Sequence, residues 1–192
     1  MNHPMKTTLA LLIGSALSLC AADMSVATLY DSQLKMVEGE VVSLAKAMPE
    51  PAYNFAPTNG AFEKVRTFGQ QVKHIATVIY VAASAAKQEK PPVEITDESG
   101  PAAVKTKAEI VKYLQDAFAY GHTAMATLTA ANQLEMVKAP FPGMPDMARG
   151  GIANLAIWHS FDHYGQMAVY ARMNNVIPPA SQPAPPAGAK KK

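Results

Sequence analysis

Four stretches of the chain repeat apolar residues at the spacing of an α-helix. Apolar residues recur three to four positions apart with polar residues between them, which places them on one face of a helix. Prolines, glycines and short polar runs separate the stretches. The pattern predicts an all-α chain with four helices, at residues 27–48, 61–87, 106–131 and 152–177.

Two of the predicted helix boundaries carry sequence signals of their own. Thr106 is followed three residues later by Glu109, the pattern of a capping box at the start of the third helix. Pro178-Pro179 ends the last helix, because proline lacks the N–H that a helix interior needs. These signals mark the start of the third predicted helix and the end of the last one.

The first 22 residues resemble a secretory signal peptide. Lys6 precedes an apolar run that is too short to span a bilayer, and small residues follow it. We therefore expect an exported protein, periplasmic or secreted, without a stable membrane span. Cys20 lies in a sequence similar to a lipoprotein box, but Leu19 occupies a position where such boxes have a small residue. Lipidation is therefore the less favoured alternative.

Composition indicates one helical domain at residues 23–177 and excludes several kinds of site. Of the 192 residues, 49% are apolar and only 7% aromatic, which suits packed helices better than a β-sandwich. The net charge of +2 provides no dense basic face for nucleic acid. Cys20 is the only cysteine, so a mature chain without the leader has no thiolate ligand. Residues 178–192, rich in proline, alanine and lysine, predict a disordered tail.

The fourth predicted helix carries His159 and His163, four positions apart. This spacing puts both imidazoles on one face, about one turn apart, within the apolar stripe of the helix. A buried histidine pair needs a partner, and a shared metal ion is the simplest one. On spacing alone, a pair that satisfies itself in the core and an exposed pair remain alternatives.

The residues around this pair resemble the last helix of the DinB-like family. The matching pattern is His159-x-x-x-His163-x-Gly165-Gln166, then Tyr170-x-Arg172 and Pro178-Pro179. Residues 66–76 look like the second-helix motif of that family, which reaches the metal-binding histidine at His74. Polar residues replace part of the apolar run that usually precedes this histidine, namely Gln70, Gln71 and Lys73. The resemblance implies an up-and-down four-helix bundle.

The resemblance also implies one divalent metal, zinc or nickel, held by His74, His159 and His163 with a position open to water or substrate. Studied relatives in the superfamily include metal-dependent transferases and isomerases that use small thiols, so a thiol-dependent transferase is one expectation. Export favours a hydrolase acting on a small molecule, because small thiols are scarce outside the cytoplasm. The alternative is a non-catalytic bundle that binds a metal or another ligand and could form a homodimer. In a third hypothesis the histidines hold no metal and only bond to each other in the core.

Other residues near the pair have weaker candidate roles. Asp162 is the candidate catalytic residue, as a base or as an acceptor for an imidazole, with a surface contact as the alternative. Ser160 stands where an HExxH metalloprotease has its glutamate, which argues against such a protease. Gln166 could hold a metal-bound water or make a core contact, and His122 is expected to be a lone helix histidine rather than a fourth ligand. The loop at 137–151 is expected to lie over the site.

Overall fold

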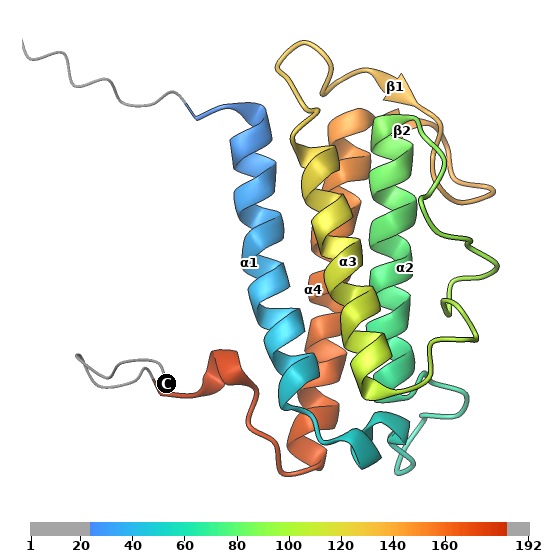
Figure 1. Ribbon diagram of the computed structural model, residues 1–192, viewed down its shortest axis with the longest axis vertical. Coiled ribbons are helices and arrows are strands. Elements are labelled where there is room, and N and C mark those ends of the chain that lie inside the picture. Colours follow the sequence, from blue (N-terminus) through green and yellow to red (C-terminus); the bar gives the residue numbers. More distant parts are fainter. Residues whose placement is uncertain (1–23, 184–192) are drawn as a thin grey trace, which may run out of the picture.

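The structure is a computed structural model that describes residues 24–183. Four long helices form a bundle, shown in Figure 1: α1 (Val26–Ala47), α2 (Phe68–Lys87), α3 (Lys107–Met125) and α4 (Arg149–Met173). The shorter elements are the 3-10 helices η1 (Glu50–Asn54) and η2 (Pro179–Ser181) and the antiparallel strands β1 (Met136–Val137) and β2 (Met147–Ala148). The predicted all-α four-helix bundle is confirmed.

Helices α2 and α3 run parallel to each other. Thr77 Oγ1 lies 3.1 Å from the Tyr113 hydroxyl and Ser84 Oγ lies 3.2 Å from the Tyr120 hydroxyl, so the contacts advance together along both helices. The segment 88–106 returns along the outside of the bundle to the start of α3 (Figure 1). Successive helices therefore alternate in direction except across this crossover, so the helix order is not the strict up-and-down order that the family resemblance implies.

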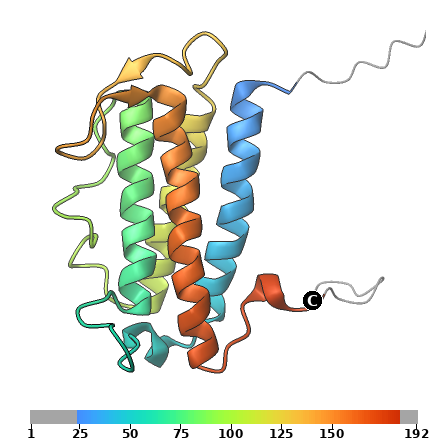
Figure 2. The ribbon, with the colours of Figure 1, turned by 180° about the vertical axis from the view of Figure 1, so that it is seen from behind.

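Helix α2 is the most enclosed of the four helices. It packs against α3 and against α4, which lies beside it in Figure 2, and the crossover lies along it. Of its 20 residues 15 are buried, because it has two helical neighbours. The largest fully buried side chains in the core include Phe68, Phe118, Leu34, Leu44, Ile75, Ile79, Leu114 and Met167. Burial of each such side chain stabilises the fold by about 1.5–3 kcal/mol.

Four predicted helix boundaries were wrong by three residues or more. Helix α4 runs from Arg149 to Met173, not over residues 152–177, so it ends before the Pro178-Pro179 pair that was expected to end it. Local hydrogen bonds explain the other two. Helix α2 begins at Phe68, not at residue 61, because Thr67 and Gln70 form a capping box. Thr67 Oγ1 accepts from the Gln70 N–H at 3.3 Å, and Gln70 Oε1 accepts from the Thr67 N–H at 2.8 Å. Helix α3 ends at Met125, not at residue 131.

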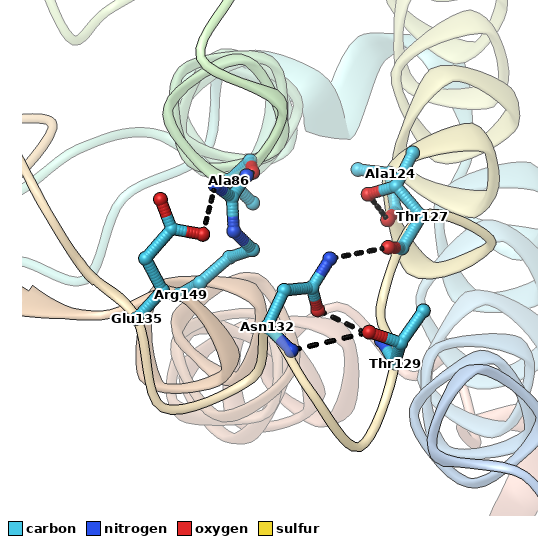
Figure 3. Close-up of polar contacts among 7 residues, drawn as sticks. All are labelled: Ala86, Ala124, Thr127, Thr129, Asn132, Glu135 and Arg149. Atoms are coloured by element: carbon cyan, nitrogen blue, oxygen red, sulfur yellow. Dashed lines mark hydrogen bonds and ion pairs between the residues drawn. The ribbon is translucent and has the colours of Figure 1, made fainter.

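The chain after α3 turns because its side chains bond to backbone groups (Figure 3). Asn132 Oδ1 accepts from the Thr129 N–H at 2.8 Å, and Asn132 Nδ2 donates to the Thr127 carbonyl at 2.9 Å. The Thr127 hydroxyl donates to the Ala124 carbonyl at 2.7 Å. Such bonds compete with helical hydrogen bonds and so favour a turn.

Arg149 fixes the start of α4 against the end of α2. Its guanidinium donates to the Ala86 carbonyl and, at 2.8 Å, to a carboxylate oxygen of Glu135 (Figure 3). The loop 137–151 therefore lies at the C-terminal end of α2. Since His74 comes 12 residues before Ala86, roughly 18 Å along a helix, the expectation that this loop covers the histidine site was wrong.

The chain ends give two further results. The predicted signal peptide, residues 1–22, lies outside the described residues. The start of the tail that the sequence predicts to be disordered forms the 3-10 helix η2, and Arg172 Nη2 donates to Ser181 Oγ at 3.0 Å. Residues 184–192 lie outside the described part. Among the helices of residues 24–183, none has the length and apolar character to cross a membrane.

Candidate metal centre

The three histidines that the sequence singles out come together between α2 and α4. His74 lies on α2, and His159 and His163 lie one turn apart on α4. One ring nitrogen from each lies within 4.8 Å of the other two. His74 and His163 are buried, at 4% and 8% exposure, and His159 is half-buried. Helical spacing thus supplies two members of the cluster, and packing of α2 on α4 supplies the third.

Hydrogen bonds on the outer side of two rings determine which nitrogen faces the centre. His74 Nδ1 lies 2.8 Å from the backbone oxygen of Glu98, and His163 Nδ1 lies 2.6 Å from Oε1 of Gln71. Both partners are acceptors, so both Nδ1 atoms carry the hydrogen and donate. The Nε2 atoms of His74 and His163 then keep the lone pair that a metal ligand needs.

The distance between the inward nitrogens of the two α4 histidines fits a tetrahedral metal. His163 Nε2 lies 3.1 Å from His159 Nε2. Two nitrogens at zinc–nitrogen bond lengths in a tetrahedral site are about 3.3 Å apart. Within residues 24–183 no carboxylate or cysteine belongs to the cluster, so the donor set consists of three imidazoles. Such a set suits zinc or nickel and leaves a fourth position open.

The imidazoles are neutral at pH 7, which is the form that binds metal. Burial lowers the pKa of His74 below its usual value. Burial, together with the neighbouring His163 and His74, lowers the pKa of His159 to about 3. Burial and His74 lower the pKa of His163 to about 4. The cluster therefore carries no positive charge of its own to repel a cation.

A glycine in the crossover brings Glu98 to His74. Gly100 is buried and has a φ of +78°, a conformation that side chains rarely adopt. A Cβ at this position would lie 2.8 Å from Thr77 Oγ1 on α2. The glycine thus lets the crossover lie directly on α2. The sequence analysis did not identify Glu98, because it acts through its backbone, and Gly100 is the one signal that marks the close approach.

A polar pocket borders Gln71, the hydrogen-bond partner of His163, but none of the three histidines lines it. It has a volume of about 450 Å³, and Gln71 and Gln166 line it together with Lys64, Val65, Arg66, Gln70 and Ser99. Arg66 Nη2 lies 3.6 Å from a carboxylate oxygen of Glu98. The pocket therefore meets the residues that support the histidines and places cationic groups near them.

The remaining candidates of the sequence analysis take other positions. Asp162 is exposed and bonds to no histidine; its Oδ2 accepts from Gln166 Nε2 at 3.4 Å. Gln166 makes a polar contact with Gln71, whose Nε2 donates to Gln166 Oε1 at 2.9 Å. Ser160 is buried and donates to the Ala156 carbonyl at 2.7 Å.

His122 lies on α3 and takes no part in the cluster. Its Nδ1 lies 2.6 Å from an oxygen of Asp31, and its Nε2 lies 3.1 Å from an oxygen of Glu38. Both carboxylates belong to α1. His122 therefore lies apart from the cluster of His74, His159 and His163. It does not stand alone on its helix as expected, because it bridges two carboxylates.

Comparison with known sequences assigns the family. The family model of the DinB superfamily matches residues 33–167, a range that includes all three histidines. The chain belongs to the DinB superfamily. No protein with a curated description matches it. The superfamily assignment agrees with the resemblance noted in the two histidine-containing helices.

Three solved structures share the fold of this chain. A DinB-like protein from Bacillus cereus superposes with a TM-score of 0.64 at 16% identity, covering 81% of this chain and 97% of that chain. One from Bacillus subtilis gives 0.59 at 17% identity, with 77% and 92% covered. A conserved protein from Enterococcus faecalis gives 0.62 at 17% identity, with 78% and 97% covered. These identities are low, so the likeness concerns the fold alone.

Proposed function

We propose that this protein binds one divalent metal ion, zinc or nickel, through Nε2 of His74, His159 and His163. The observation that carries the proposal is the pair of outer hydrogen bonds to Glu98 and Gln71, which leaves inward lone pairs on two buried, neutral rings. In addition, His159 Nδ1 is buried and has no partner among the described residues. This unsatisfied group costs about 1–3 kcal/mol, so no outer hydrogen bond holds the His159 ring as Glu98 and Gln71 hold the other two.

The favoured activity is metal-dependent hydrolysis of a small molecule, with thiol-dependent transfer as the second possibility. When bound, the metal supplies Lewis-acid chemistry that polarises a carbonyl or acidifies water. The histidines hold the ion, Glu98 and Gln71 orient the rings, and the polar pocket offers Arg66 to an anionic group of the substrate. The signal-like N-terminal sequence supports action outside the cytoplasm.

One observation favours the non-catalytic alternative, a bundle that holds metal without turnover. Asp162, the carboxylate nearest in sequence to the pair, is exposed and contacts Gln166 rather than the cluster. A hydrolytic site needs a proton acceptor within reach of the reacting water. The two functions therefore differ in whether a metal-loaded protein turns over a substrate at all.

Metal content of the untagged protein tests the proposal. We expect about one equivalent of zinc or nickel by mass spectrometry, and its loss in His163→Ala. His122→Ala is the matched control, because it removes a histidine outside the cluster and should keep the metal. A wild-type protein that stays metal-free after reconstitution contradicts the proposal. If metal is present, hydrolysis of model esters that requires both metal and His163 favours the enzyme, and no turnover favours the binder.

A further inference from the structure

We propose that Asp162 is a positioning residue that determines, through Gln166 and Gln71, which nitrogen of His163 faces the metal centre. The four side chains form one chain of hydrogen bonds that leads from the surface of α4 to the buried cluster. The relevance of this chain to metal affinity rests on the proposed function. Its effect on the His163 ring does not, because the hydrogen bonds are present in the protein itself.

The helical positions of these residues bring them into one line. Asp162 and Gln166 lie four residues apart on α4, and Gln71 faces them from α2. From the surface inward, the donor–acceptor distances are 3.4 Å, 2.9 Å and 2.6 Å. Gln71 is 2% exposed, whereas Asp162 and Gln166 are exposed. From Asp162 to His163, the hydrogen bonds therefore become shorter and the side chains that make them less exposed to solvent.

The Asp162 carboxylate, at the outer end of the hydrogen-bond chain, determines how both glutamine amides are oriented. An ionised carboxylate can only accept hydrogen bonds, so Gln166 must turn its amide NH2 toward Asp162. Its Oε1 then faces Gln71, which must donate its own NH2 in turn. Gln71 consequently turns Oε1 toward His163 and accepts from Nδ1. His163 is held with the hydrogen on Nδ1 and the lone pair on Nε2.

The opposite direction would disable His163 as a ligand. Each glutamine amide has a donor end and an acceptor end, so the two amides could rotate together and keep their mutual bond. Gln71 would then present its NH2 to Nδ1 of His163, and the hydrogen would move to Nε2. That hydrogen would point at His159 Nε2, 3.1 Å away. Among the four side chains, Asp162 is the group that makes one orientation of the two glutamine amides more favourable than the other.

Nitrogen-15 NMR of the metal-free protein tests this inference directly, because long-range couplings distinguish the two imidazole tautomers. We expect His163 in the wild type to carry its hydrogen on Nδ1. In Asp162→Asn both directions become available, so we expect a mixture of tautomers. Asp116→Asn, which removes an exposed carboxylate on α3, is the matched control and should leave His163 unchanged.

Zinc affinity, measured by competition with a chelator, gives a second readout. Gln71→Leu should weaken binding about 10- to 100-fold, as is usual for loss of a residue that supports a metal ligand. Asp162→Asn should weaken it less, because its contact is longest. Gln71→Glu should restore the wild-type tautomer and affinity to Asp162→Asn, because a carboxylate at position 71 accepts from Nδ1 by itself.

Specific outcomes contradict the inference. It is overturned if wild-type His163 carries its hydrogen on Nε2, or if Asp162→Asn keeps the pure Nδ1–H tautomer. A wild type that shows the expected tautomer but takes up no zinc would contradict the proposed function and leave the positioning role intact. Far-UV circular dichroism of each variant confirms that the bundle has folded before the tautomer is assigned.

Discussion

His74 on α2 donates through Nδ1 to the backbone oxygen of Glu98, 2.8 Å away, in the crossover between α2 and α3. This bond joins a buried metal-ligand candidate to a segment that lies outside the bundle. It also fixes the tautomer of His74 without any side chain from the crossover. The position of the crossover on α2 is therefore part of the site, and Gly100 controls that position.

Replacement of Gly100 by alanine should destabilise the protein and weaken its metal site. An alanine here would have to keep an unfavourable positive φ, and its Cβ would lie 2.8 Å from Thr77 Oγ1. We therefore expect a loss of about 1–3 kcal/mol in the free energy of unfolding. The crossover should shift away from α2, and the Glu98 oxygen should move from His74. Urea unfolding and zinc titration measure the two effects.

Gly143→Ala is the matched control for this substitution. Gly143 also has a positive φ, +83°, but a Cβ there would meet nothing within 4 Å. It should show only the conformational cost, about 1–2 kcal/mol, with unchanged zinc affinity. Equal loss of affinity in both variants would contradict a specific role for the contact between the crossover and α2.

Zinc should stabilise the folded protein through the histidine cluster. A ligand that binds only the folded state at 100 times its Kd adds about 2.7 kcal/mol to the free energy of unfolding. We therefore expect a higher unfolding midpoint with zinc, reversed by a chelator, and no shift in His159→Ala. Thermal unfolding of wild type, His159→Ala and the control His122→Ala measures this. A similar shift in His159→Ala would locate the bound zinc elsewhere.

The sequence predicted the two helices that carry the histidine cluster better than it predicted the residues that support the histidines. Spacing of four along a helix is enough to bring His159 and His163 together, and the family resemblance added His74. Glu98 contributes a backbone oxygen, which every residue has, so no residue type marks it. Gln71 was noted as a departure from an apolar run, yet its amide accepts from His163 and so has a role that its polarity alone did not reveal.

The positions of the helices were easier to predict than their boundaries and directions. Amphipathic periodicity located four helices because each buries one or two faces in a common core. The end of α3 and the start of α2 were misplaced because capping and turn bonds, such as those of Thr67 and Asn132, decide boundaries within a few residues. The parallel direction of α2 and α3 depends on how the crossover packs, which periodicity does not record.

Arg149 should contribute to stability by capping α2. Its side chain is 11% exposed and donates to the Ala86 carbonyl in the last turn of α2. Arg149→Met removes this donor, and the unsatisfied carbonyl should cost about 1–3 kcal/mol. Urea unfolding measures the loss. Glu135→Gln is the comparison, because Glu135 is 51% exposed and its ion pair should contribute less than about 1 kcal/mol; equal losses would contradict the capping role.

His122 should make the stability of the α1–α3 contact depend on pH. Burial acts to lower its pKa, but the hydrogen bonds to Asp31 and Glu38 outweigh burial and raise it above the usual 6.5. Because the folded state holds the proton more tightly than the unfolded chain, the stabilisation is complete below about pH 6.5. It is lost as the pH rises through the folded-state pKa.

Comparison of the wild type with His122→Gln isolates this effect, because the three histidines of the cluster titrate alike in both proteins. With metal removed by a chelator, we expect the wild type to be more stable by about 1 kcal/mol near pH 6, given two partly exposed ion pairs. The difference should shrink toward zero by about pH 9, since His122 is then neutral and the two carboxylates are no longer neutralised. Urea unfolding at intervals of pH measures it. A difference that grows with pH would show that His122 acts as a neutral hydrogen-bond partner and not as a cation between Asp31 and Glu38.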